Sequence, residues 1–200
     1  MSSPTLSAAE IERSRVESAA AALGSNATPK DTGPAVVLRT PRLGDGAQMW
    51  RIAKESAVLD ANSSYAYLLW CRDFAGTSVV AELNGRIVGY VIGFVRPQAP
   101  DTVFVWQVAV ERSQRGRGTG ADLLHTLLNS VSAKGVSVLE TTISPDNTAS
   151  IAMFRSVARV REAAISKCPL FDAAVFPDSH APEELYRIAP TARTTEEDYR

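Results

Sequence analysis

Apolar and polar residues alternate or cluster along the middle of this chain in patterns that predict a series of strands and helices. Two β-rich runs, residues 77–83 and 86–95, flank Asn84-Gly85, a pair in which both turn positions tolerate positive φ. We predict that these runs pair as an antiparallel hairpin. Further strands are predicted at residues 36–39, 103–110, 136–143, 162–165 and 185–188.

Apolar positions at helical spacing predict helices over residues 45–56, 64–73, 121–133 and 147–157. The resulting order is β-α-α-β-β-β-α-β-α-β-β, in which a helix connects the strands at 103–110 and 136–143. A crossover of that kind makes the two strands parallel, whereas the hairpin is antiparallel. The predicted fold class is therefore α/β (α+β), with a mixed central sheet flanked by helices.

One domain, residues 35–190, is predicted to hold the fold. A chain of 200 residues with 45% hydrophobic content can bury a single sizeable core. Residues 1–34 contain many Ala, Ser, Thr and Pro and are predicted to be a mobile N-terminal extension. Residues 191–200 are polar and acidic, and we expect a flexible C-terminal tail.

Charge and apolar runs argue against several classes of function. The 21 basic and 22 acidic side chains give a net charge of −1, so no broad basic surface for nucleic acid is expected. No apolar run approaches the ~18–20 residues of a membrane span, and the N-terminus lacks a secretory pattern. We expect a cytoplasmic protein with no membrane partner. Cys71 and Cys168 lack metal-like spacing and are predicted to be reduced thiols, and no metal is predicted.

The glycine-rich loop at residues 115–120, RGRGTG, lies between a predicted strand and a predicted helix. Glycines let the backbone approach a ligand, helix N-termini favour anions, and two arginines add positive charge. A P-loop would end in Gly-Lys-Ser/Thr and a Rossmann fingerprint would read Gly-x-Gly-x-x-Gly, and this loop fits neither. The loop is therefore predicted to bind the pyrophosphate of a cofactor.

The spacing of Arg115, Gly118 and Gly120 resembles the coenzyme A pyrophosphate loop of the GCN5-related N-acetyltransferase (GNAT) family. The resemblance implies the GNAT acyl-CoA N-acyltransferase fold, with acetyl-CoA as co-substrate. It also implies that the strand before the loop separates from its neighbour and pairs with the pantetheine arm. The implied cofactor-binding residues are Gln107, Val108, Ala109, Val110, Arg115, Gly116, Arg117, Gly118, Thr119, Gly120, Asn147, Ser150 and Phe154.

Phe154 departs from the family pattern, because many relatives have a tyrosine at this position that is assigned as the acid protonating the thiolate. Phenylalanine has no proton to donate. A thiol with a pKa near ~8.5 is a tolerable leaving group. Water or another tyrosine, such as Tyr65, is therefore predicted to protonate the departing thiolate.

Glu140 is a lone charge in an otherwise apolar or hydroxyl-bearing strand, and an isolated buried acid is costly. We predict that it binds an ammonium group or accepts its proton; an ion-paired or strand-edge position is the alternative. Between the first two predicted helices, Asp60 and Tyr65 lie in a polar segment that shapes the acceptor pocket of this fold and are predicted to be catalytic. For Asn62, capping the helix is an alternative role.

Three segments narrow the resemblance to the diaminobutyrate acetyltransferases of ectoine biosynthesis: LDANSSYAYLL (59–69), VWQVAV (105–110) and PDNTAS (145–150). This resemblance implies acetyl transfer to the 4-amino group of L-2,4-diaminobutyrate, a small diamino acid, by a homodimer. The predicted substrate contacts are Asp60, Asn62, Ser64, Tyr65, Trp106, Glu140 and His180. The alternatives are an acetyltransferase for another small diamine, amino acid or protein amine, and a non-catalytic acyl-CoA-binding regulatory module.

Overall fold

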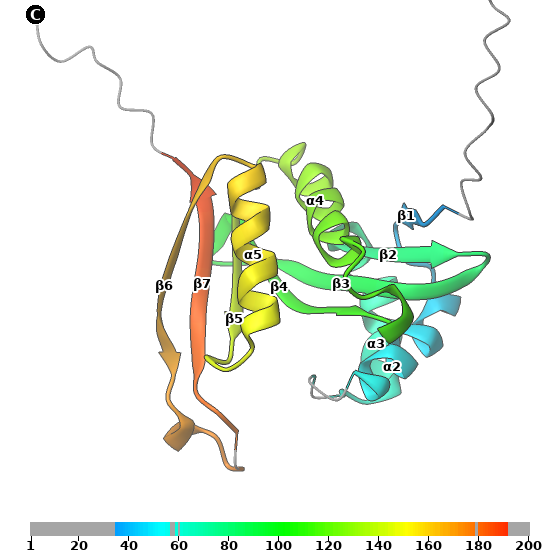
Figure 1. Ribbon diagram of the computed structural model, residues 1–200, viewed down its shortest axis with the longest axis horizontal. Helices are drawn as coiled ribbons and strands as arrows, with labels where there is room; N and C mark the ends of the chain where they lie inside the picture. Colours follow the sequence, from blue (N-terminus) through cyan, green and yellow to red (C-terminus); the bar gives the residue numbers. More distant parts are fainter. Residues whose placement is uncertain (1–34, 57–58, 60, 179, 192–200) are drawn as a thin grey trace, which may run out of the picture. The chain divides into compact units, whose positions relative to one another are not determined.

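The computed structural model describes residues 35–56, 59, 61–178 and 180–191. These residues form a mixed seven-stranded sheet with the order β1-β2-β3-β4-β5-β7-β6 (Figure 1). Its β4–β5 pair is parallel and its other neighbouring pairs are antiparallel. The strands are β1 (Val37–Arg39), β2 (Ser78–Leu83), β3 (Arg86–Arg96), β4 (Ala99–Val110), β5 (Val138–Ile143), β6 (Ala163–Phe171) and β7 (Glu183–Pro190).

The helices are α2 (Gly46–Glu55), α3 (Ser64–Arg72), α4 (Thr119–Ser132) and α5 (Thr148–Val160). Helices α4 and α5 pack with one face of the sheet in a core that includes Val91, whereas α2 and α3 pack in a second core that includes Ile92. Adjacent strand residues point to opposite faces, so the two helix pairs cover opposite sides of the sheet. In the described part of the chain, no helix is long and apolar enough to cross a membrane.

The predicted hairpin is confirmed. Asn84 and Gly85 have φ values of 52° and 77°, and β2 and β3 pair antiparallel around them. Both turn residues are left-handed, as the twist of a two-residue hairpin requires.

Two strands near the C-terminus are longer than the sequence pattern predicts. The predicted strands covered residues 162–165 and 185–188, but β6 and β7 pair from Ala163 to Phe171 and from Pro190 to Glu183. Most of β6 is exposed, so apolar and polar residues do not alternate along its full length and the sequence pattern does not reveal the whole strand. Backbone pairing with β7 holds this segment extended. The predicted terminal segments, residues 1–34 and 191–200, lie outside the described residues except for Thr191.

Strands β4 and β5 separate shortly after they meet. Their parallel register runs from Thr102–Val138 to Phe104–Glu140, and the described residues show no pairing beyond that point. The hydroxyl of Thr141 donates to the carbonyl oxygen of Val105 at 3.0 Å where the strands part. The expected separation is thus present, and it leaves the end of β4 unpaired on one edge. We call this point, defined by Phe104 and Glu140, the fork.

Candidate active site

The glycine-rich loop leads directly into α4 through two left-handed residues. Gly116 and Gly118 have φ values of 74° and 85°, conformations that residues with a Cβ adopt only with strain. Gly118 is the N-cap of α4, and no side chain caps the helix. The first N–H groups of a helix lack intrahelical partners, so here they remain available to an anion. This geometry fits a pyrophosphate group.

Gly120 allows close packing between the loop and α5. A Cβ added at Gly120 would lie 2.7 Å from Sδ of Met153. The side chain of Arg115 folds back, with Nε donating to the carbonyl oxygen of Val110 at 3.3 Å. Arg117 is exposed, while Thr119 is buried in the first turn of the helix. The loop therefore presents mainly backbone groups and the side chains of two exposed arginines, Arg115 and Arg117.

Gln107 lies just beyond the fork, and its side chain is held inside the α2–α3 core. Its Oε1 accepts hydrogen bonds from the hydroxyls of Tyr67 at 3.1 Å and Tyr90 at 3.0 Å. Burial raises the pKa of Tyr90 far above its ordinary value, so this hydroxyl stays a neutral donor. The side chain of Gln107 is therefore used in folding. The side chain of Ala109 points into the same core, and those of Val108 and Val110 pack against the other one.

Trp106 interrupts the pairing of β3 with β4. The register passes from Gly93–Val105 to Ile92–Gln107, which leaves Trp106 without a partner on β3 as a β-bulge. Its side chain is 50% exposed. Bulges redirect side chains, and this one places an exposed indole next to the fork.

The predicted residues of α5 are used in folding. Oδ1 of Asn147 accepts from the N–H of Ser150 at 3.1 Å and caps the helix, as its position before an apolar run favours. Phe154 is 2% exposed and belongs to the α4–α5 core. Its ring fills the volume that a tyrosine would occupy, without a hydroxyl.

Glu140 is buried at the fork between two arginines. Its Oε2 lies 2.6 Å from Nη1 of Arg96, at the end of β3, and its Oε1 lies 3.5 Å from Nε of Arg187, its register partner on β7. The ion-paired position that the sequence left as an alternative is therefore occupied. A carboxylate has about four lone-pair sites, so these contacts leave room for a further donor.

The polar segment before α3 is described in part. Asp60 lies outside the described residues; Asn62 is half-buried, and Ser64 and Tyr65 begin α3 with Tyr65 64% exposed. Ser63 occupies the N-cap position, but its side chain makes no capping hydrogen bond. Among the described residues, Tyr65 has no hydrogen bond to Glu140.

His180 lies near the carboxyl end of β5. Its ring stacks on Phe176 at 4.3 Å, and its Nε2 lies 3.9 Å from Oε1 of Glu183. The same oxygen accepts from the hydroxyl of Ser144, which follows β5, at 3.0 Å. The imidazole therefore lies beside the start of β7, next to the carboxyl end of β5.

Sequence reasoning missed the partners around the predicted residues, above all Arg96 and Arg187. The signal was Glu140 itself, because a buried acid requires a cation or several donors. Which arginine supplies the cation depends on the register of the strands, and the spacing of apolar residues does not reveal that register. The described residues also contain no group of three or more His, Cys, Asp or Glu side chains that could hold a metal ion.

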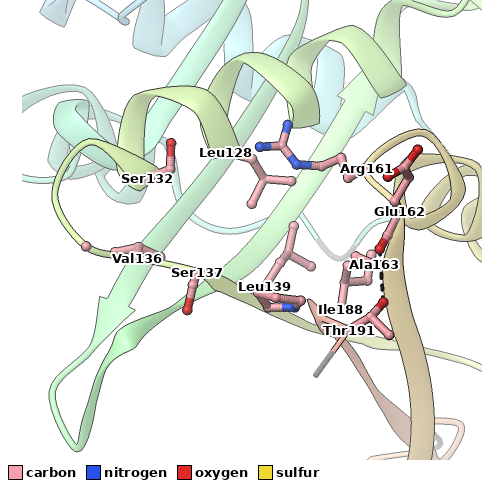
Figure 2. Close-up of a pocket in the computed structure, with 12 residues that line it drawn as sticks. Leu128, Ser132, Val136, Ser137, Leu139, Arg161, Glu162, Ala163, Ile188 and Thr191 are labelled. Carbon is pink, nitrogen blue, oxygen red and sulfur yellow. Dashed lines mark hydrogen bonds between the residues drawn. The ribbon is translucent and has the colours of Figure 1, made fainter. Parts of the chain in front are cut away.

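A hollow of about 640 Å³ lies away from these residues, at the C-terminal end of α4 (Figure 2). Leu128, Leu139 and Ile188 give it an apolar floor, and Arg161 and Thr191 lie at its edge. None of the predicted site residues lines it. It is separate from the fork and the loop.

The mixed sheet, the parting of β4 from β5 and the glycine-rich start of α4 define an acetyltransferase of the GNAT class. Residues 47–158 match the sequence profile described as the acetyltransferase (GNAT) family, and the chain belongs to that family.

Comparison with individual proteins narrows this class. An L-2,4-diaminobutyric acid acetyltransferase from Nocardia farcinica is 69% identical over 157 residues, covering 78% of this chain and 81% of that protein. One from Streptomyces coelicolor is 58% identical over 153 residues, covering 75% and 90%. The chain therefore belongs, within the GNAT family, with the L-2,4-diaminobutyric acid acetyltransferases.

A solved structure agrees with this grouping. The diaminobutyrate acetyltransferase EctA from Paenibacillus lautus, in complex with its substrate L-2,4-diaminobutyric acid and coenzyme A, is 38% identical to this chain with a TM-score of 0.76. The match covers 79% of this chain and 96% of that one.

Proposed function

We propose that this protein transfers the acetyl group of acetyl-CoA to the 4-amino group of L-2,4-diaminobutyrate, giving N4-acetyl-L-2,4-diaminobutanoate in ectoine biosynthesis. The observation that carries the proposal is the fork. An anion-binding loop follows one of the separating strands, and a charged cluster lies where the strands meet. The arrangement suits an acyl carrier with a pyrophosphate and an acceptor with charged groups.

The loop and β4 are proposed to hold acetyl-CoA, which supplies an activated acetyl group as a thioester. The backbone of residues 116–120 and the charges of Arg115 and Arg117 would bind the pyrophosphate. The backbone of residues 107–110, where β4 has parted from β5, would bind the pantetheine arm and donate to the thioester carbonyl. Asn147, Ser150 and Phe154 would shape the site through the start of α5.

The acceptor is proposed to approach at the fork. Glu140 and Asp60 would bind ammonium groups and take a proton, and Trp106 would offer an aromatic face to a cation. Asn62, Ser64 and His180 would complete the acceptor pocket. As the C–N bond forms and the C–S bond breaks, the amine loses a proton, and Tyr65 or a water molecule protonates the thiolate.

We also propose that the protein is a cytoplasmic homodimer. Its contact involves β6, β7 and the segment that connects them, which we call the β6–β7 arm. This arm carries exposed Leu170, Phe171 and Val175. Exposed apolar side chains grouped on one segment are typical of protein interfaces. Light scattering should give twice the mass of one chain, and Phe171→Glu should shift the protein toward the monomer.

Thiol release in the presence of acetyl-CoA and a panel of amines tests the activity. We expect diaminobutyrate to be preferred over ornithine, lysine, polyamines and a peptide, with the product acetylated at N4 by NMR. A regulatory module would release no thiol, and a protein acetyltransferase would ignore free diamines. Either result would overturn the proposal.

A further inference from the structure

Arg96, Glu140 and Arg187 form a compact charged cluster on one face of the sheet. The neighbours of Glu140 and Arg187 along their strands, such as Leu139 and Ile188, belong to the α4–α5 core. Because adjacent strand residues alternate, the three charged side chains face away from α4 and α5. Among the described residues, the α2–α3 core contains no residue of β5, β6 or β7, so that core does not reach this part of the face.

The cluster has an excess of positive charge. The side chain of Glu140 is 8% exposed, but those of Arg96 and Arg187 are 41% and 47% exposed. One carboxylate between two guanidinium groups leaves a formal charge of +1. In the described part of the chain, neither arginine has a hydrogen-bond or ion-pair partner other than Glu140. Each guanidinium carries five N–H donors, so most of them remain for a ligand.

We propose that Arg96 and Arg187 bind the α-carboxylate of the acceptor amino acid. The inference rests on the proposed function and adds how that substrate is recognised. With the carboxylate bound to the arginines, the two guanidinium groups face two carboxylates, that of Glu140 and that of the substrate. The 4-amine then extends from the arginines toward the end of β4, and Glu140 keeps the proton-accepting role proposed above.

Two other arginines, Arg72 and Arg155, are less suited to bind the substrate carboxylate. Arg72 is already paired in bidentate fashion with Asp73, at 2.8 Å and 2.7 Å. Arg155 is on α5, which covers the opposite face of the sheet. Planar guanidinium groups bind carboxylates through paired hydrogen bonds, and such a site rejects an analogue that lacks the carboxylate.

The test compares diaminobutyrate with 1,3-diaminopropane, the same chain without its carboxylate. In the unmodified protein we expect kcat/KM for diaminobutyrate to exceed that for the diamine by at least about 100-fold. Arg96→Gln and Arg187→Gln should each raise KM for diaminobutyrate by about 10- to 100-fold and leave KM for acetyl-CoA unchanged. They should leave kcat/KM for 1,3-diaminopropane nearly unaltered, so the preference shrinks.

Lys167→Gln is the matched control, because Lys167 lies on the same arm and pairs with Glu184 on β7, but on the α5 side of the sheet. It should keep the full preference. An unmodified protein that uses both amines equally, or arginine variants that lose activity on both amines in the same proportion, would overturn the carboxylate site. An unmodified protein that acetylates neither amine would overturn the proposed function instead.

Discussion

The carbonyl oxygen of Gly118 accepts a hydrogen bond from the N–H of Asp122 at 3.0 Å, closing the first turn of α4. Gly118 makes this contact from a left-handed conformation, with φ of 85°. The loop can therefore turn into the helix at once, and the helix N-terminus opens directly beyond β4.

Gly118→Ala should strain this turn. A Cβ in the left-handed region costs about 1–2 kcal/mol, so the free energy of unfolding in urea should fall by that amount. KM for acetyl-CoA should rise, because the strained loop would no longer present its N–H groups in place. Gly44→Ala is the control, since Gly44 lacks positive φ and an added Cβ there meets no atom within 4 Å. Equal effects of the two changes would contradict the role given to the loop.

Glu140→Gln should lower kcat with diaminobutyrate by about 100-fold or more, the range of a lost acid–base group, while KM for acetyl-CoA stays unchanged. The amide keeps the size of the side chain but removes the negative charge that an ammonium requires. Glu184→Gln is a suitable control, because Glu184 pairs with Lys167 on the α5 side of the sheet. Steady-state kinetics with both substrates varied would decide, and an unchanged kcat would remove Glu140 from the mechanism.

Local signals predicted the elements and the loop, but not the cluster at the fork. Asn84-Gly85 and the glycines at 116 and 118 act through their own backbone conformations, so their neighbours along the chain suffice to interpret them. Arg96 and Glu140 are 44 positions apart and meet only because β4 pairs with β3 on one side and β5 on the other. The long β6 was underestimated for a related reason, since its backbone is held by β7.

Asp45 should make stability depend on acid. Burial alone would raise the pKa of Asp45, but hydrogen bonds from the Arg39 side chain and the Arg42 N–H outweigh it, so its pKa lies below the ordinary value. Below pH ~4 the Asp45 carboxylate takes up a proton in the unfolded chain more readily than in the folded protein. The stability that Asp45 contributes is therefore fully present above that pH and is lost as the pH falls through its folded-state pKa. Asp45→Asn should lose roughly 1.5–3 kcal/mol at pH 7 and show a flatter decline between pH 5 and 3 in urea titrations. Asp73→Asn, in an exposed pair with Arg72, should change stability much less than Asp45→Asn does.

The two thiols should differ sharply in reactivity. Cys71 is 4% exposed, and burial raises the pKa of its thiol to about 11, whereas Cys168 is exposed on β6. A thiol reagent at pH 7.5 attacks the thiolate, so both access and ionisation protect Cys71. Peptide mapping by mass spectrometry should find Cys168 modified first and Cys71 modified only after urea is added. Because β6 belongs to the proposed dimer contact, modification of Cys168 should quicken on dilution. Rapid labelling of Cys71 in the native protein would mean that the α2–α3 core opens far more readily than its packing against Met49 and Tyr67 implies.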